Sequence, residues 1–497
     1  MTVEPRNIPE LLQQRANAAP DKVFLLSEAD ERQFTYREFE QAVARAAGML
    51  AVHGIGKGDV VSLLLPNSVE YIVAYFACWR LGAMAGPVNG HLKTQEIEYV
   101  VSNSESKLML VNSEFLGKVE GSRVPVTVFD SERQAGEGFK EDKRAEIELQ
   151  DEAIIIYTSG TTGKPKGCLL THGNVIANAR QISTWLGFTE HDRLLTVMPL
   201  FHMNAVSVTT MSALYAGSST VVSQKFSASR FWQIISDYQI TSFGSVATML
   251  SMLLSSYPDG VPAGLKTDQL RFAMCGSAPV PAEVLRRFEE TFNCLVVEGY
   301  GLSESTCRST FNPPDERRRP GSCGLPIGNE MRVVDDGDRD VPEGELGEIL
   351  LRGENILKGY FKNEAATASA FRNGWFHTGD IGYRDADGFY YIVDRKSDMI
   401  IRGGENIYPR EIDEVLYQHP QIAAAAVIGV ADRLYGEEVA AVVVLKAGAN
   451  LSEAEVIEFC KARLADYKCP KTVRFVADIP KGPTGKLLKR ELAQMFR

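Results

Sequence analysis

"STVVSQKFSASRFWQIISDYQITSFGS", residues 219–245, contains two short apolar runs on either side of an amphipathic segment. The runs 219–224 and 240–245 have the length and the flanking polar residues that are typical of buried strands. Between them, Phe231, Ile234 and Ile235 recur at the spacing of one helical face. A strand, a helix and a second strand in this order predict a βαβ unit, with parallel strands whose sheet is covered by helices.

The same alternation extends in both directions along the chain. Residues 246–301 read as a helix, a strand, a helix that begins at Pro281, and a further strand, and an earlier set lies between about residues 35 and 115. From about residue 321 the apolar residues alternate with polar ones and turns are frequent, which predicts antiparallel β structure. After Arg402 an α+β pattern begins, including a capping box of Ser452 and Glu455.

These patterns predict an α/β protein with two domains. We expect a large N-terminal domain, residues 1–396, made of helix-covered, mostly parallel sheets plus a β-rich subdomain at about 321–393. A hinge is expected at 394–398, followed by a small mobile α+β domain at 397–497.

Composition excludes several classes of protein. The chain has 497 residues and a formal net charge of −11, with no basic run that would suggest nucleic-acid binding. No apolar run reaches the roughly 18 residues of a membrane helix, and the polar start is unlike a signal peptide. The eight cysteines form no C-x-x-C pair, so we expect reduced thiols in a cytoplasmic protein.

The strongest local signal is "IIIYTSGTTGKPKG", residues 154–167. A buried strand runs into a loop that holds four hydroxyl side chains, three glycines and two lysines. Glycines let a backbone approach an anion closely, hydroxyls donate hydrogen bonds to phosphate oxygens, and lysines neutralise charge. The spacing is not that of a Walker A loop. The alternative is a flexible surface hairpin, which such a concentration of phosphate-binding groups disfavours.

"YTSGTTGKPKG" resembles the signature loop of the adenylate-forming superfamily, which includes acyl-CoA synthetases, peptide-synthetase adenylation domains and firefly luciferase. Four more motifs follow in the family's order, and the resemblance covers essentially the whole chain. They are "GYGLSES" (299–305), "HTGD" (377–380), "DRKSDMIIRGGENIYPREIDEVL" (394–416) and "PTGKLLKRE" (483–491). The resemblance is greatest to acid–CoA ligases.

The resemblance implies a set of ATP and Mg2+ ligands. The phosphates would be held by Thr158, Ser159, Gly160, Thr161, Thr162, Gly163 and Lys166. The adenine would be framed by Gly276, Ser277, Ala278, Gly299 and Tyr300. Glu304 would bind Mg2+, a hard cation that prefers oxygen ligands, and Ser303, where the family usually has Thr, would meet the α-phosphate. Asp380 would accept hydrogen bonds from the ribose, assisted by Arg395.

The C-terminal motifs imply two successive reactions. Lys486 would bridge the carboxylate and the α-phosphate during adenylation, when an acyl-adenylate and pyrophosphate form. The C-terminal domain would then rotate about Ser397, where many family members have Asp or Lys. Gly403 and Gly404 would line the path of the coenzyme A thiol. Lys486 would then face water.

The acid pocket is implied to lie among two segments and the strand end near Cys275. Its residues would be His202, Met203, Asn204, Val206, Phe243, Ser245, Val246 and Gly301, with His202 near the reacting carboxylate. Amino-acid-activating relatives carry Asp where this chain has Ser227, so an ammonium would be buried without a carboxylate. Parts of the pocket segments also resemble crotonobetaine/carnitine–CoA ligases, but no carboxylate is present for a trimethylammonium. We therefore expect an uncharged, medium-length, branched, alicyclic or aromatic tail.

Three alternatives stay open from the sequence. In the first two, the acyl acceptor is an amine or a carrier-protein thiol instead of coenzyme A. In the third, the chain is an inactive nucleotide-binding scaffold. The presence of Lys486, Glu304 and Asp380 disfavours the scaffold. A homodimer and a monomer are both compatible with the sequence.

Overall fold

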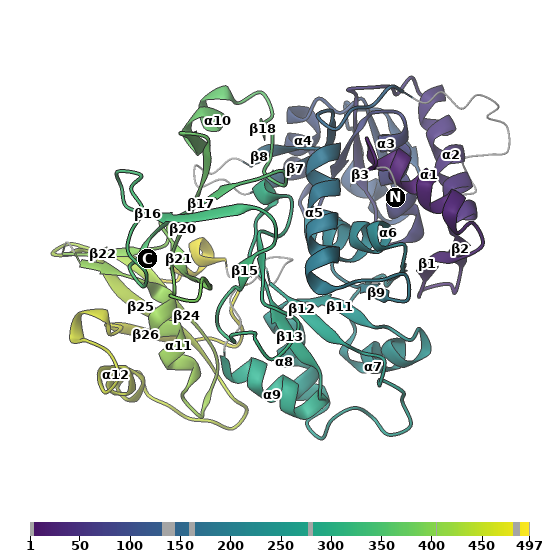
Figure 1. Ribbon diagram of the computed structural model, residues 1–497. Coiled ribbons are helices and arrows are strands. Elements are labelled where there is room, and N and C mark those ends of the chain that lie inside the picture. Colours follow the sequence, from purple (N-terminus) through teal and green to yellow (C-terminus); the bar gives the residue numbers. More distant parts are fainter. Residues whose placement is uncertain are drawn as a thin grey trace.

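The computed structural model describes residues 4–131, 145–158, 165–276, 282–403, 405–480 and 488–496. Within these ranges the chain forms two seven-stranded sheets, two five-stranded sheets and a two-stranded ribbon. The two large sheets and their helices occupy the right of Figure 1, and the antiparallel and C-terminal sheets lie to the left. The predicted α/β class, with a β-rich subdomain and a C-terminal α+β domain, is confirmed.

The first large sheet contains the strands predicted from residues 219–245. Its order is β13-β12-β11-β9-β10-β1-β2, and its neighbours are parallel except β1 and β2. The strands are β13 (Leu295–Glu298), β12 (Phe272–Cys275), β11 (Ser242–Ser245), β9 (Arg193–Thr196), β10 (Ser219–Val222), β1 (Val23–Ser27) and β2 (Gln33–Thr35). Because parallel strands all end at one edge, their following loops gather there.

The second large sheet carries the predicted phosphate loop. Its order is β18-β8-β7-β4-β3-β5-β6, parallel among β3 to β7 and antiparallel where β7, β8 and β18 pair. The strands are β3 (Val60–Leu64), β4 (Met84–Pro87), β5 (Leu108–Val111), β6 (Val126–Val128), β7 (Glu152–Thr158), β8 (Lys166–Thr171) and β18 (Gly359–Tyr360).

Helix α3 (Val69–Arg80) joins the two large sheets. It contacts β1 of the first sheet and β3 and β4 of the second, and all its residues are buried. The other helices of this region are α1 (Ile8–Ala18), α2 (Tyr36–Val52), α4 (Thr94–Asn103), η1 (Ser113–Lys118), α5 (His172–Leu186), η3 (Asn204–Met211), α6 (Ser212–Ala216), α7 (Ala228–Asp237), α8 (Ala247–Ser256), α9 (Ala282–Phe292) and η4 (Ser303–Ser305).

An antiparallel sheet follows, as the alternating pattern predicts. Its path is β16-β17-β20-β19, and β21 also pairs with β20. The elements are β14 (Thr310–Phe311), β15 (Leu325–Pro326), β16 (Glu330–Val334), β17 (Gly347–Arg352), α10 (Glu364–Ala370), β19 (Phe371–Arg372), β20 (Trp375–Arg384) and β21 (Tyr390–Arg395).

The C-terminal part has its own hydrophobic core, which includes Ile400, Ile412, Val439 and Val473. The capping box is present, since Glu455 N–H donates to Ser452 Oγ and Ser452 N–H donates to Glu455 Oε2. The elements are β22 (Ile400–Arg402), β23 (Glu405–Ile407), α11 (Pro409–Tyr417), β24 (Ile422–Asp432), β25 (Gly436–Leu445), α12 (Glu453–Lys461), η5 (Asp466–Lys468), β26 (Thr472–Phe475) and α13 (Lys489–Gln494).

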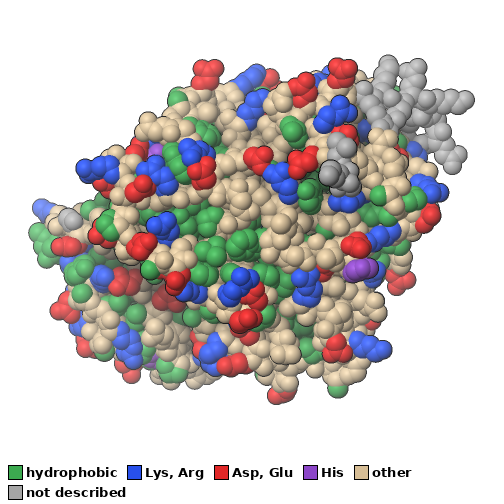
Figure 2. Space-filling model, viewed as in Figure 1, with side chains coloured by type: hydrophobic (Ala, Val, Ile, Leu, Met, Phe, Trp, Pro, Cys, Tyr) green, Lys and Arg blue, Asp and Glu red, His purple; other side chains and the backbone are tan. Residues whose placement is uncertain are grey.

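Surface and burial agree with the composition. Acidic and basic side chains are interspersed over the face shown in Figure 2. All eight cysteines are unpaired, and seven of them are buried. Among the described residues, no helix combines the length and the hydropathy needed to cross a membrane.

Candidate active site

Two predicted ribose-site residues and one predicted adenine-site residue meet where the antiparallel sheet approaches the end of β13. Asp380 of β20 lies directly opposite Arg395 of β21, and the guanidinium Nε lies 3.3 Å from Asp380 Oδ1. Tyr300, two residues beyond β13, donates its hydroxyl to Asp380 Oδ2 at 2.6 Å. Asp380 is only 5% exposed. Burial and the neighbouring Asp380 carboxylate raise the pKa of Tyr300 well above its usual value.

The proposed metal ligand, Glu304, lies beside the end of β7. Its Oε1 accepts hydrogen bonds from Thr158 Oγ1, at the end of β7, at 3.5 Å and from Tyr360 Oη at 3.1 Å. Lys166 Nζ lies 5.2 Å above the Tyr360 ring. A carboxylate, two hydroxyls and an ammonium therefore gather at one strand exit. This donor set fits Mg2+ bound together with phosphate oxygens, since Mg2+ takes one or two carboxylates and completes its shell from the nucleotide.

No group of three or more His, Cys, Asp and Glu that could hold a metal occurs in the part of the chain that the structure describes.

Several predicted site residues lie outside the described residues. They are Ser159, Gly160, Thr161, Thr162, Gly163, Ser277, Ala278, Gly404 and Lys486. Of the remainder, Ser303 begins η4 and is half-buried, and Ser397 is exposed and donates its hydroxyl to Asp398. Gly403 has φ of +58° and donates its N–H to the carbonyl of Tyr435.

Three glycines allow the segment 301–311 to lie against the ends of β12 and β13. A Cβ added to Gly276 would lie 2.6 Å from Arg308 Nη2, and one on Gly299 would lie 2.5 Å from the Phe311 ring. A Cβ on Gly301 would lie 2.0 Å from the carbonyl oxygen of Cys307. Contacts this short do not occur for real side chains, so glycine is required for this packing.

Arg308 is a site residue that the sequence motifs do not identify. It is 2% exposed, and its Nε and Nη2 have no hydrogen-bond partner among the described residues. Its main chain is held by two buried amides. Asn178 accepts from the Arg308 N–H and donates to its carbonyl at 2.7 Å, and Asn355 donates to the same carbonyl at 3.2 Å.

The backbone just before Arg308 is strained. Thr306, a β-branched residue, has φ of +66° and ψ of −53°. This conformation is held by the Cys307 N–H bonding Ser305 O at 2.7 Å and by Thr306 Oγ1 donating to Asn355 O at 2.7 Å. Strain of this kind persists only where the surroundings over-determine it, and it concentrates at functional sites.

The predicted acid-pocket residues Asn204 and Val206 lie on η3, a π-helix that contacts β9 and β11. The sequence did not predict this irregular helix, and π-turns are frequent at functional sites. Asn204 is 6% exposed, and neither atom of its amide has a partner among the described residues, nor does Ser207 Oγ. Met203 and Val206 are buried beside them.

His202 precedes this helix, and its Nε2 is buried without a partner among the described residues. Burial lowers the pKa of His202 to about 4. The imidazole is therefore neutral at physiological pH.

Two other predicted pocket residues, Phe243 and Ser245, lie on the opposite face of β11. Phe243 packs against Phe231 of α7, with ring centroids 4.9 Å apart. Gly244, the next residue, faces Asn204 on the other side of β11, since side chains alternate along a strand. Ser245 donates to the carbonyl of Met274, and Val246 is buried at the start of α8. The structure therefore does not bring Phe243 to the face that carries Asn204.

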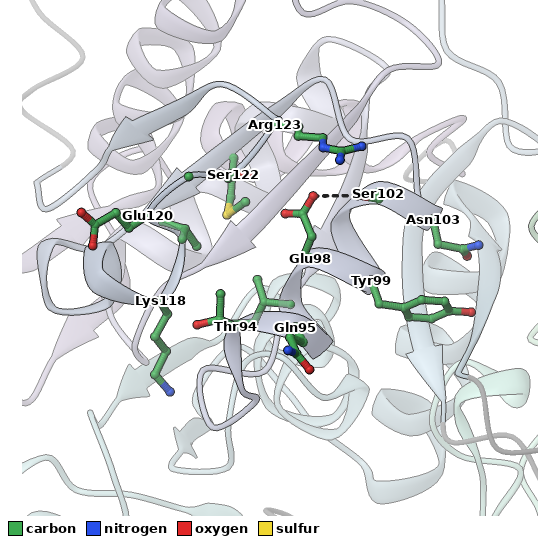
Figure 3. Close-up of a pocket in the computed structure, with 14 residues that line it drawn as sticks. Thr94, Gln95, Glu98, Tyr99, Ser102, Asn103, Lys118, Glu120, Ser122 and Arg123 are labelled. Carbon is green, nitrogen blue, oxygen red and sulfur yellow. Dashed lines mark hydrogen bonds between the residues drawn. The ribbon is translucent and has the colours of Figure 1, made fainter.

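A separate cavity of about 760 Å3 lies beside the second large sheet (Figure 3). It is lined by α4 and by the segment 118–123, and Glu98, Lys118 and Arg123 contribute charged groups. Tyr99, which also lines it, donates to the carbonyl of Pro165 at 3.2 Å. The cavity therefore borders the phosphate-loop hairpin without containing any predicted site residue.

Comparison with known proteins agrees with this geometry. The AMP-binding enzyme family matches residues 12–361, and the AMP-binding enzyme C-terminal domain matches residues 411–486. A sulfoacetate–CoA ligase of Cupriavidus necator is 36% identical over 97% of this chain and 96% of its own length. A long-chain-fatty-acid–CoA ligase of Mycobacterium tuberculosis is 35% identical over 99% of both chains.

A solved structure shares both the fold and the domain order. It is the o-succinylbenzoate coenzyme A synthetase of Bacillus subtilis in complex with ATP and magnesium ion, which is 34% identical with a TM-score of 0.87, covering 97% of this chain and 98% of that one. This chain therefore belongs to the AMP-binding enzyme family, as one of its AMP-forming acid–CoA ligases.

Proposed function

We propose that the residues gathered at the ends of β7 and β13 and in the middle of β20 are the adenylation site of this ligase. The enzyme uses ATP, Mg2+ and coenzyme A. The observation that carries the assignment of the site is the pair of contacts Tyr300–Asp380 and Thr158–Glu304. They join a ribose-type acceptor and a metal-type carboxylate from three separate segments of the chain.

The chemistry has two steps. A carboxylate oxygen of the acid attacks the α-phosphorus of ATP, the bond to the bridging oxygen breaks, and pyrophosphate leaves. The coenzyme A thiol then attacks the acyl carbon, and AMP leaves with the oxygen that came from the acid. Charge develops on phosphate oxygens in the first step, so placed cations and hydrogen-bond donors are the catalysts required.

The roles follow from what each side chain can donate. Lys486 and Lys166 neutralise phosphate charge, and Ser303 donates to the α-phosphate. Glu304 would hold Mg2+, which supplies positive charge between the phosphates. Asp380 accepts from the ribose and orients the nucleotide. Neutral His202 donates a hydrogen bond to the reacting carboxylate without a titration of its own near pH 7.

The domain assignment rests on the separate cores. We assign residues 1–396 to the nucleotide- and acid-binding domain, 394–398 to a hinge at Ser397, and 397–497 to a mobile domain. The support is that Ile400 to Val473 form a cluster apart from that of the large sheets, and that Ser397 is exposed. Rotation about the hinge exchanges Lys486 for Gly403 and Gly404 at the site.

The acid is the open part of the function. The named acids of the relatives range from sulfoacetate to long-chain fatty acids, so relationship does not choose among tails. The absence of a carboxylate for an ammonium disfavours cationic tails. The sequence predicts an uncharged alicyclic or aromatic tail. The buried Arg308 makes an anionic tail a second candidate.

The test is release of pyrophosphate from ATP by the purified chain with a panel of uncharged, dicarboxylic and sulfonated acids. With coenzyme A present, an active acid is expected to yield an acyl-CoA thioester. If added amines yield an amide while coenzyme A yields no thioester, the acyl acceptor is an amine and the assignment of coenzyme A is wrong. No pyrophosphate release with any acid would contradict the catalytic proposal. Sedimentation of the same sample tests the homodimer, and localisation of the tagged chain tests the cytoplasmic prediction.

A further inference from the structure

Arg308 presents an unbalanced buried charge. A guanidinium cannot be deprotonated in a protein, so burial without a partner is costly. Two of its nitrogens, Nε and Nη2, lack partners among the described residues, and its Cζ lies 5.4 Å from the centroid of the Phe311 ring. The Nε and Nη2 pair is the edge that binds a carboxylate or a sulfonate with two parallel hydrogen bonds.

The position of this edge is fixed by its surroundings. The main chain of Arg308 is held at its N–H and its carbonyl by Asn178 and Asn355, both fully buried. The side chain extends over Gly276, where even a methyl group would collide with Nη2. A charge that is positioned this firmly, with two nitrogens that have no partner among the described residues, indicates a binding group, because a site must be organised before its ligand arrives.

The orphaned amide of Asn204, on η3, lies on the same face of the sheet. Gly244 of β11 pairs with Met274 of β12, and Gly276 is two residues further along, so both glycines face one side. Asn204 Oδ1 lies 3.1 Å from a Cβ built on Gly244, as Arg308 Nη2 lies 2.6 Å from one built on Gly276. Two such positions on neighbouring strands are about 8 Å apart.

We propose that the acid activated by this enzyme carries a second anionic group, a carboxylate or a sulfonate, and that Arg308 binds it through Nε and Nη2. Asn204 and Ser207 supply the neighbouring hydrogen bonds. Arg308 is thus a specificity-determining residue, and the tail is anionic rather than uncharged. This inference rests on the proposed ligase function and narrows its substrate.

The experiment compares acids in matched pairs that differ only at the far end. Short dicarboxylates are paired with their monomethyl esters, and sulfoacetate with propionate, in the pyrophosphate-release assay on the full chain. We expect the wild type to favour the dianionic member by about 30-fold or more in kcat/KM, the lower end for a buried charge pair. In Arg308→Met the ratio is expected to fall close to one, with KM for ATP unchanged, and Arg308→Lys is expected to restore part of it.

Arg80→Met is the matched control. Arg80 is also buried, but it pairs with Glu40 at 2.7 Å. This variant is expected to lower Tm and leave the acid preference unchanged. Arg308→Met is expected to hold or raise Tm in the free protein, since replacing an unpaired buried charge with an apolar side chain of similar volume removes its desolvation cost.

Three results would overturn the inference. The first is a wild type that favours the esters. The second is an equal loss of kcat/KM on both members of each pair in Arg308→Met, which would put the guanidinium at the reacting carboxylate. The third is an unchanged ratio of kcat/KM within each pair in that variant. If no acid releases pyrophosphate, the ligase proposal fails separately. Thermal shift by dicarboxylates and sulfoacetate without ATP then decides the inference: a shift in wild type that Arg308→Met loses supports it, and no shift in wild type contradicts it.

Discussion

At the residue scale, burial determines the protonation of two groups near the site. His202 is neutral at physiological pH because its imidazole is buried, with its pKa at about 4. Glu298, at the end of β13, is likewise shifted toward its uncharged form. Burial raises its pKa to about 7, although its Oε2 accepts the Gly321 N–H at 2.8 Å. Both shifts disfavour the charged form, as desolvation requires.

Glu298 therefore makes stability depend on pH. The unfolded carboxyl ionises near pH 4.5 and the folded one near 7, so the folded state binds more protons between these values. The free energy of unfolding falls as pH rises through this window, by on the order of 3 kcal/mol. Glu298→Gln should lose that dependence and be the more stable protein at pH 8 in urea denaturation. A wild type that gains stability relative to the variant from pH 5 to 8 would contradict the assignment.

How much of the site the sequence predicts depends on whether a residue sits in a patterned motif. Thr158, Glu304 and Asp380 stand in quoted motifs, and the structure places Thr158 beside Glu304 and Asp380 beside Arg395. Arg308 lies four residues beyond Glu304 with no periodicity around it. Its burial depends on asparagines 130 and 47 residues away in the chain, which no local pattern reveals. Tyr360 is not predicted as a site residue either, because its contact with Glu304 joins residues 56 positions apart in the chain.

At the scale of elements, the segment 301–311 organises the site. It carries Glu304 in η4 and Arg308, and it can lie against β12 and β13 because Gly276, Gly299 and Gly301 have no side chains. The strands and helices around it follow from hydrophobic periodicity, so residues 219–276 and 282–301 form the elements that the sequence predicts. The π-helix η3 was not predicted, because its residues are apolar or small on all sides and give no period to read.

Gly301→Ala tests this packing directly. Its Cβ would lie 2.0 Å from a backbone oxygen, so the segment has to move. We expect a loss of about 3 kcal/mol or more in the free energy of unfolding, or loss of folded protein, with adenylation abolished. Gly117→Ala, where nothing lies within 4 Å, is the control and should change stability by less than about 1 kcal/mol. Equal stability of the two variants would show that the segment is not tightly packed.

At the scale of the whole molecule, the proposed mechanism requires two arrangements of the domains. The separate cores of the large sheets and of the C-terminal part permit such a motion. The order of the domains can be predicted from the sequence, because the spacing of hydrophobic residues in the β-rich subdomain differs from that in the α+β domain. The alternation itself is not readable from one conformation, since it concerns Lys486, which lies outside the described residues.

Lys486→Ala separates the two half-reactions. Removal of the cation that bridges carboxylate and α-phosphate should reduce adenylation by several orders of magnitude. Conversion of a supplied acyl-adenylate to the thioester should persist, since Lys486 then faces water. Pyrophosphate release and thioester formation are measured on the same preparation. A comparable loss in both steps would contradict the rotation.

The path of one oxygen atom tests the central claim, that the acid is activated as an acyl-adenylate. The full chain is supplied with an acid labelled with 18O in its carboxylate, together with ATP and coenzyme A, and the products are analysed by mass spectrometry. The account predicts that one labelled oxygen appears in AMP, and none in pyrophosphate, for each thioester formed. Label in inorganic phosphate with ADP as the other product, or thioester without labelled AMP, would contradict it.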